Sequence, residues 1–127
     1  LDTDELLREI SFGDWDGYTN EEVAEKWSEV FQSWRGSWTK SPPNGESLED
    51  FDLRIRKARQ MILEKYRGKT VVVVAHVMPI RGFLTLAMEA GPAGYWRPQV
   101  APCSISVIRH WGEDFAELVT ANFTAHL

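Results

Sequence analysis

The 127-residue sequence has a single cysteine, Cys103, which excludes an internal disulfide bond. One free thiol is compatible with a reducing compartment, and we expect the protein to be cytoplasmic. No apolar run approaches the ~20 residues that a membrane-spanning helix needs. Residues 1–10 carry too many acidic side chains for a signal peptide. The sequence therefore predicts no association with a membrane.

Positive charge is also scarce, since 14 Lys and Arg oppose 19 Asp and Glu for a formal net charge of −5. This balance provides no basic surface for nucleic acid, and we expect no nucleic-acid partner. Any phosphate chemistry must then depend on a local group of positive charges. No two of the histidines have the spacing of metal ligands, and Cys103 has no partner. The sequence predicts neither a metal site nor another cofactor.

Tryptophan, by contrast, is abundant, and four of the six tryptophans lie in one early segment: Trp15, Trp27, Trp34 and Trp38. Within this segment, Thr19 and Glu22 form a capping-box pattern that begins a helix. We expect a helical segment over about residues 19–38 with a wide aromatic stripe. The stripe is either core packing or the inner side of a cap that supplies an apolar wall to a ligand site.

Two later segments also have clear patterns. Ser47 begins a second helix, with an N-cap signal and apolar residues at spacings of three and four up to Gly68. Near the C-terminus, residues 104–110 and 115–120 predict two strands of a hairpin, joined at Gly112-Glu113-Asp114.

The segment Thr70–Met88 changes from a strand pattern to a helix pattern. Val71–Val74 is a β-branched run without polar alternation, which predicts a central strand buried on both faces. Pro79 suits the first turn of the helix that follows. His76 therefore lies where a strand ends and a helix begins. In open α/β sheets ligands bind at such a place, and the free N–H groups of the helix favour an anion.

The order of helix, helix, strand, helix and hairpin predicts an α/β fold, a three-layer sandwich in which helices flank a mostly parallel sheet. The predicted sheet has too few strands to cover both edges of its central strand. We therefore expect this chain to be part of a larger sheet. The missing strand would come from upstream residues, from another chain, or from a second copy in a homodimer or strand swap.

The candidate site residues each have a structural alternative. His76 is either hydrogen-bonded to backbone or a ligand contact, and its place at the strand end favours the ligand contact. Arg81 either holds an anion or forms a surface ion pair. Glu9 is either a solvated carboxylate, which residue statistics favour, or an acid sheltered by the aromatic residues that follow it. Such shelter raises the pKa of a carboxyl group. His110 and His126 lack a comparable context, and packing is the better interpretation of both.

Three stretches resemble, in order and spacing, the histidine phosphatase superfamily of phosphoglycerate-mutase-like proteins: Leu7-Arg8-Glu9-Ile10-Ser11-Phe12-Gly13-Asp14-Trp15-Asp16-Gly17, Asn44-Gly45-Glu46-Ser47 and Val73-Val74-Ala75-His76. The run His76-Val77-Met78-Pro79-Ile80 has valine where most members have glycine. In this it is similar to the acid-phosphatase domains that are fused to ribonuclease H in actinobacteria. The resemblance covers nearly all of the chain and implies a phosphoglycerate-mutase-like fold.

The resemblance also implies a reaction, the hydrolysis of small phosphomonoesters through a phosphohistidine intermediate. It assigns His76 to binding the phosphoryl oxygens and stabilising the transition state, and Glu9 to protonating the leaving alkoxide. We expect Arg81, Val77 and Trp15 to contact the phosphate or the substrate. A small phosphorylated molecule is the expected partner.

One part of the family pattern is absent from residues 1–127. In the family, the nucleophile lies in an Arg-His-Gly motif on the first strand and a phosphate-binding arginine lies in the following helix, and neither occurs here. We therefore expect a partial histidine phosphatase domain that is inactive alone, since neither His110 nor His126 has an Arg-His-Gly context. Two alternatives stay open: a phosphoglycerate mutase-type phosphoryl transfer, and a non-catalytic module that binds a phosphorylated ligand or another chain.

Overall fold

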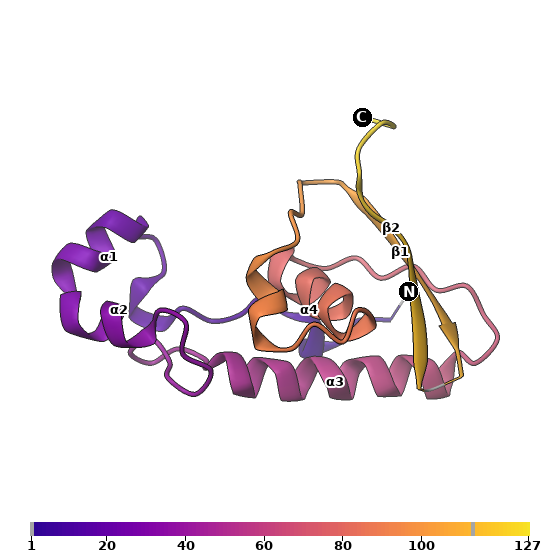
Figure 1. The fold of residues 1–127 in the computed structure, drawn as a ribbon, viewed down its shortest axis with the longest axis horizontal. Helices are drawn as coiled ribbons and strands as arrows, with labels where there is room; N and C mark the ends of the chain where they lie inside the picture. Colours follow the sequence, from indigo (N-terminus) through magenta and orange to yellow (C-terminus); the bar gives the residue numbers. More distant parts are fainter. Residues whose placement is uncertain (1, 113) are drawn as a thin grey trace. The chain divides into compact units, whose positions relative to one another are not determined.

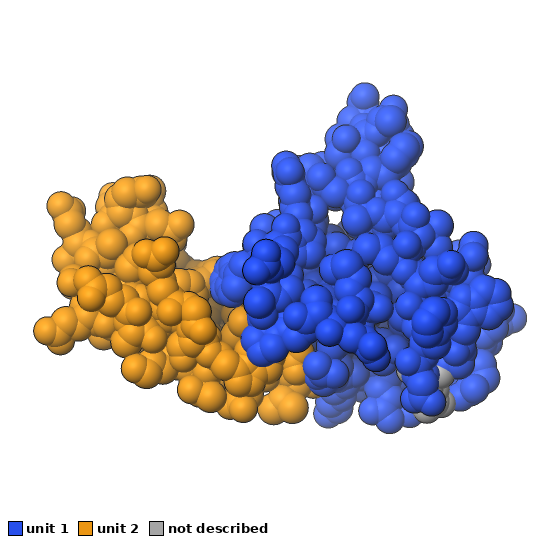
Figure 2. Space-filling model, in the orientation of Figure 1, with its two compact units in different colours: residues 1–9, 54–127 blue, residues 10–53 orange. Residues whose placement is uncertain are grey.

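The computed structural model describes residues 2–112 and 114–127, and it divides into two compact units. One unit comprises residues 10–53, and the other comprises residues 1–9 together with residues 54–127 (Figure 2). The longest helix, α3 (Leu48–Lys65), contributes residues to both units. Across the part of the chain that is described, no helix is long and apolar enough to cross a membrane.

Residues 10–53 contain two short helices, α1 (Asn20–Lys26) and α2 (Ser28–Trp34) (Figure 1). The predicted capping box is confirmed, because Thr19 and Glu22 each accept the other's backbone N–H through their side chains. The helical segment is nevertheless not continuous. Trp27 departs from helical backbone angles, with φ −128° and ψ 43°, and separates α1 from α2. Its N–H still donates to the Val23 carbonyl, and its carbonyl accepts from Phe31 N–H.

The aromatic side chains of residues 10–53 pack on one another. Trp15 ends the 3₁₀ turn η2 (Gly13–Trp15) and is only 5% exposed. Its indole ring meets Phe31 and Trp34 edge to face, at centroid distances of 5.7 and 5.1 Å. Such pairs contribute about 0.5–1.5 kcal/mol beyond their buried area. Inside this unit the aromatic stripe therefore acts as packing.

The loop before α3 is joined to the turn at Gly13. Asp14 N–H donates to the Pro43 carbonyl at 2.9 Å, and Glu46 N–H donates to the Ser11 carbonyl at 2.8 Å. Gly13 has φ +56°, and a Cβ atom at this position would overlap the carbonyl oxygen of Pro43. Glycine is needed here for its conformation and for the close approach of two backbones.

The core of the other unit lies where α4 (Val77–Ala87) packs on α3. Gly82 makes this approach close, because a Cβ atom there would lie 2.9 Å from Ile55 Cγ2. Ile55 and Leu84 are fully buried, as is Tyr95 in the 3₁₀ turn η3 (Pro92–Trp96). The predicted helix after Ser47 is confirmed in α3, and the Ser47 hydroxyl accepts from Asp50 N–H at 3.1 Å as an N-cap.

The predicted C-terminal hairpin is confirmed. Strands β1 (Ile105–Trp111) and β2 (Phe115–Phe123) pair antiparallel, with Arg109 opposite Glu117. Of the predicted connection, Glu113 lies outside the described residues. Every second side chain of both strands is exposed, and most of these side chains are apolar: Ile105, Val107, Trp111, Phe115, Val119 and Phe123.

The valine run Val71–Val74 forms no strand in the described chain. It belongs to no ladder, and the side chains of Val72 and Val74 are 84% and 89% exposed. The described sheet consists of β1 and β2 alone and is antiparallel, so the predicted mostly parallel sheet with a buried central strand is not confirmed. A strand is stabilised by hydrogen bonds to a neighbour, and no described segment supplies these bonds to the valines.

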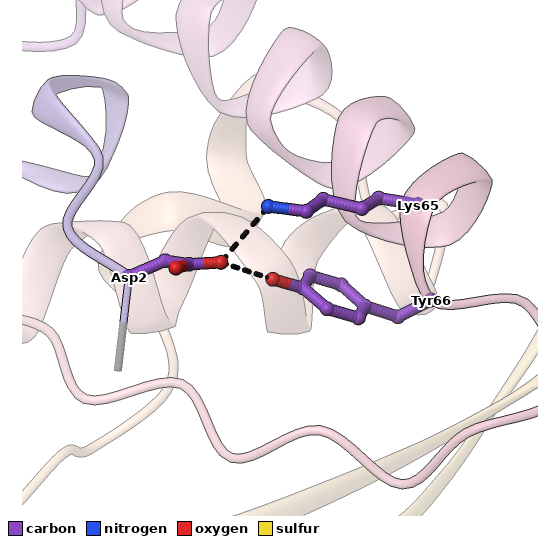
Figure 3. Close-up of polar contacts among 3 residues, drawn as sticks. All are labelled: Asp2, Lys65 and Tyr66. Carbon is purple, nitrogen blue, oxygen red and sulfur yellow. Dashed lines mark hydrogen bonds and ion pairs between the residues drawn. The ribbon is translucent and has the colours of Figure 1, made fainter.

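The N-terminal segment is tied to the end of α3. Lys65 Nζ and Tyr66 OH both donate to Asp2 Oδ2, at 2.8 and 2.5 Å (Figure 3). The hydrogen bond from Lys65 lowers the pKa of Asp2, and the hydrogen bond to Asp2 raises the pKa of Lys65 above its usual range. Both charges are exposed, so water screens their attraction.

Candidate functional site

The N-terminus of α4 brings together two of the predicted site residues, His76 and Glu9. His76 is the N-cap residue, with extended backbone angles of φ −91° and ψ 178°. Met78 N–H donates to both carboxylate oxygens of Glu9, at 3.1 and 3.4 Å, although 69 residues separate the two in the sequence. The carboxylate thus lies at the positive end of the helix, beside the second residue after His76.

The local sequence explains which backbone donors are available here. The N–H groups of an N-cap residue and of the first three helical residues have no partner inside the helix. Pro79, confirmed in the first turn of α4, has no N–H, and the N–H of Met78 is taken by Glu9. Among the described residues, no acceptor is found for the N–H groups of His76 and Val77, so they remain to donate to a ligand.

The imidazole of His76 is exposed and makes no capping hydrogen bond to its own helix. The His76 carbonyl, rather than the side chain, starts the helical ladder by accepting from Ile80 N–H at 3.2 Å. The side chain is therefore accessible to a ligand at the same helix end as the Glu9 carboxylate.

The backbone of Glu9 is held by Arg54, a residue that the sequence patterns did not identify as part of the site. Arg54 is a residue of α3 and is 9% exposed. Its Nη1 donates to the carbonyls of Leu6 and Arg8, at 2.7 and 2.9 Å. Its Nη2 donates to the carbonyl of Glu9 at 3.2 Å.

Arg81 and Trp15, the other predicted contacts, belong to different units. Arg81 Nε donates to the Pro98 carbonyl at 2.9 Å, and its Nη1 lies 3.9 Å from Met78 Sδ. Arg81 thus joins α4 to the segment after η3. Trp15 lies in residues 10–53, where its buried indole nitrogen has no hydrogen-bond partner among the described residues.

The other two histidines have packing contacts. His110 is half-buried in β1, and burial, followed by the charge of Arg59, lowers the pKa of His110. His126 Nε2 lies 3.1 Å from the Cys103 carbonyl, and its ring stacks on Phe123 at a centroid distance of 5.6 Å. Both environments fit the packing role that the sequence favours.

The chemistry available at the start of α4 follows from these groups. An imidazole, free N–H donors and a helix dipole can bind an anion, and a carboxyl group beside them can exchange a proton with it. Within residues 2–112 and 114–127, no three His, Cys, Asp or Glu side chains are grouped closely enough to hold a metal ion.

Comparisons with known proteins agree on one family. Residues 1–124 match the sequence profile of the histidine phosphatase superfamily (branch 1). The chain is 36% identical over 124 residues to the bifunctional protein Rv2228c of Mycobacterium tuberculosis. This match covers 98% of this chain and 34% of the mycobacterial protein. It is 30% identical over 125 residues to phosphoserine phosphatase 1 of Hydrogenobacter thermophilus, which covers 98% of this chain and 59% of the relative.

Among solved structures, the chain is similar to Bacillus stearothermophilus YhfR, with a TM-score of 0.83 and 25% sequence identity. The match covers 98% of this chain and 62% of YhfR. The chain thus spans about a third of the mycobacterial relative and about three fifths of the other two proteins.

Proposed function

We propose, from the premise that this chain belongs to the histidine phosphatase superfamily, that it supplies a general acid and a phosphoryl-binding histidine for the hydrolysis of small phosphomonoesters. The predicted resemblance to this superfamily and to an actinobacterial relative is confirmed. The fold is that of the superfamily, whose members include phosphatases, so phosphoryl chemistry is the shared property. The division of roles between residues is our proposal.

The observation that carries the proposal is the hydrogen bond from Met78 N–H to Glu9, at the helix end that begins with His76. It supports the proposal because the Glu9 carboxylate and His76, from distant parts of the sequence, meet at the same helix end. A phosphoryl group bound by the imidazole and these donors would have a proton donor next to its ester oxygen.

The proposed reaction has two steps, and Glu9 acts in both. A nucleophilic histidine first attacks phosphorus and forms a P–N bond. The P–O bond to the alcohol breaks, and the Glu9 carboxyl group gives its proton to the leaving oxygen. Water then attacks the phosphohistidine, the P–N bond breaks, and the Glu9 carboxylate takes a proton from the water. Phosphate leaves, and both residues return to their starting state.

The other proposed contacts supply N–H donors and positive charge to the phosphoryl group. His76 and the Val77 N–H would donate to the phosphoryl oxygens, whose negative charge increases their binding to the positive end of α4. Arg81 would add a positive charge near the first turn of the helix.

The nucleophile, in this proposal, comes from outside residues 1–127, either in cis or from another chain. None of His76, His110 and His126 lies in an Arg-His-Gly sequence. The exposure of Val72 and Val74 supports a partial domain, since a neighbouring strand would cover these side chains and complete a mostly parallel sheet around Val71–Val74.

Hydrolysis of a generic aryl phosphate tests the function. We expect no turnover from the 127-residue chain, and turnover from a polypeptide extended upstream to include an Arg-His-Gly segment. In the extended enzyme, His76→Ala and Glu9→Gln should each lower kcat by about 100-fold or more, whereas the control His126→Ala should leave it unchanged. Robust turnover by the 127-residue chain that is lost in His110→Ala or His126→Ala would overturn the proposal.

The same enzyme distinguishes the alternatives. Release of phosphate to water from the phosphorylated enzyme identifies a phosphatase, and transfer to a second hydroxyl group identifies a mutase. A non-catalytic module would bind its phosphorylated ligand equally well after His76→Ala and Glu9→Gln.

A further inference from the structure

We propose that Arg54 is a positioning residue for Glu9, an inference that depends on the proposed role of Glu9 as proton donor. Arg54 does not approach His76 or the helix end through any of its described contacts. It acts on the backbone that carries Glu9.

Three hydrogen bonds of Arg54 are directed at one short segment. Two of its nitrogens donate to three carbonyl groups, those of Leu6, Arg8 and Glu9, at 2.7, 2.9 and 3.2 Å. A planar guanidinium can meet several acceptors at fixed angles, which the single ammonium of lysine cannot do. The three acceptors are neutral backbone carbonyl groups, and they satisfy buried N–H donors of the guanidinium.

Residues 8–10 belong to no helix or strand, and they follow the short 3₁₀ turn η1 (Glu5–Leu7). The direction of the Glu9 side chain therefore depends on tertiary contacts with its backbone. Arg54 supplies such contacts on both sides of the Glu9 peptide unit.

A small displacement of Glu9 would weaken the hydrogen bond at its carboxylate. Met78 N–H lies 3.1 and 3.4 Å from the two carboxylate oxygens, which is the long end of the range for this kind of hydrogen bond. A displacement of about 1 Å in a reacting group can lower a rate by about 100-fold. A shift of the Glu9 backbone would therefore be enough to lower the rate of proton transfer.

Arg54 is well placed to set this position relative to α4. The next residue in α3, Ile55, is fully buried and packs against Gly82 of α4. The guanidinium that holds Glu9 and the helix that receives its carboxylate are thus attached to one packed core. This core therefore fixes both groups that contact Glu9, the Arg54 guanidinium and the Met78 N–H.

A spectroscopic experiment tests the positioning in the protein itself. The amide proton of Met78 should shift with pH because it donates to the Glu9 carboxylate, and Glu9→Gln should remove this shift. We expect Arg54→Lys and Arg54→Met to reduce the amplitude of the Met78 shift at least about two-fold, because the carboxylate moves away from the N–H. Signals of Gly82 and Leu84 should stay in place. Arg56→Lys, an exposed arginine on the same helix, is the matched control and should behave as wild type.

A Met78 titration of wild-type amplitude in the folded Arg54 variants would overturn the proposal. Loss of folding in both Arg54→Lys and Arg54→Met would assign Arg54 to stability alone and would overturn it as well.

A double-mutant cycle in the extended enzyme gives the second test. Arg54→Lys should lower kcat roughly 10- to 100-fold with KM nearly unchanged, because positioning affects the chemical step. The pair Glu9→Gln with Arg54→Lys should be no slower than Glu9→Gln alone. Multiplying losses would show that Arg54 acts independently of Glu9 and would refute the inference.

The two proposals fail in different ways. If Glu9→Gln leaves the rate and its pH dependence unchanged, the proposed function is wrong, and the Met78 titration still decides whether Arg54 positions Glu9. If Glu9→Gln is slow and the Arg54 variants are fast, only the further inference is wrong.

Discussion

Glu9 is fixed at both ends, its carbonyl by Arg54 and its carboxylate by the N–H of Met78. A side chain held in this way pays little conformational entropy when it reacts, because its geometry is set before the substrate arrives. The carboxyl group is half-buried, so it can still exchange a proton with a ligand or with water. At the scale of single residues, the proposed chemistry is therefore tested by substituting Glu9.

The pH dependence of the extended enzyme is the direct test of that carboxyl group. Only a protonated acid can donate, so kcat should fall as pH rises, and Glu9→Gln should remove this limb of the profile. Glu46→Gln, which changes a half-buried glutamate in the other unit, should retain it. A profile that Glu9→Gln leaves intact would rule out the acid role.

The Asp2, Lys65 and Tyr66 cluster should respond to acid. The pKa of Asp2 is lowered from 3.8, so its ionised form is bonded above that pH and the bonds are lost as pH falls through the lower folded value. We expect the ring signals of Tyr66 to shift in this acidic window in nuclear magnetic resonance spectra. Asp2→Asn should abolish the shift and Asp16→Asn should not. A Tyr66 signal that does not respond to acid would contradict the contact in Figure 3.

At the scale of elements, the turn at Gly13 shows how backbone contact fixes a loop. We expect Gly13→Ala to destabilise the protein by about 3 kcal/mol or more, because strain at positive φ is joined by overlap with Pro43. The matched control is Gly36→Ala, where φ is +74° and no atom lies within 4 Å of an added Cβ. Its cost should be about 1 kcal/mol. Denaturant unfolding, followed by tryptophan fluorescence, measures both; equal costs would exclude the overlap.

Local signals in the sequence were enough to predict several of these elements. The capping box at Thr19, the N-cap at Ser47 and Pro79 in the first turn of α4 are all present, because each depends on atoms within one turn of helix. The hairpin is also local, since its two strands are neighbours in the sequence. The break at Trp27 has no comparable signal, because no glycine or proline marks it.

Long-range contacts could not be predicted in the same way. The sequence indicated His76 and Glu9 separately, but their meeting through Met78 depends on tertiary packing. Arg54 could have been identified from the helix pattern in the sequence. It follows Phe51 by three residues, a spacing that places it on the buried side of α3, where a charged residue is unusual.

The whole molecule exposes apolar surface on the valine run and on one side of the hairpin. The prediction of a central strand failed for the described chain because a valine-rich sequence specifies a strand only when a neighbour is present to pair with it. The preference for β structure is in the sequence, whereas the pairing requires a neighbouring strand.

Hydrogen exchange can show whether an extended polypeptide supplies the neighbour. We expect the amides of Val71–Val74 to exchange rapidly in the 127-residue chain, since they belong to no ladder. In the extended polypeptide they should become protected, while the amides of β1 exchange similarly in both. Equal exchange of the valines in both polypeptides would contradict a completed sheet.

The contacts of Arg54 also set an order in which the protein can assemble. They close chain segments of 45 to 48 residues, whereas the bond from Glu9 to Met78 closes one of 69 residues. During synthesis from the N-terminus, α3 leaves the ribosome before α4 does, so Arg54 can hold the Glu9 segment first. Glu9 is then in position when α4 emerges, and its carboxylate can cap that helix as soon as the first turn forms. Such a cap stabilises a helix by about 1 kcal/mol. We expect the step that completes the site to be the same step that nucleates α4.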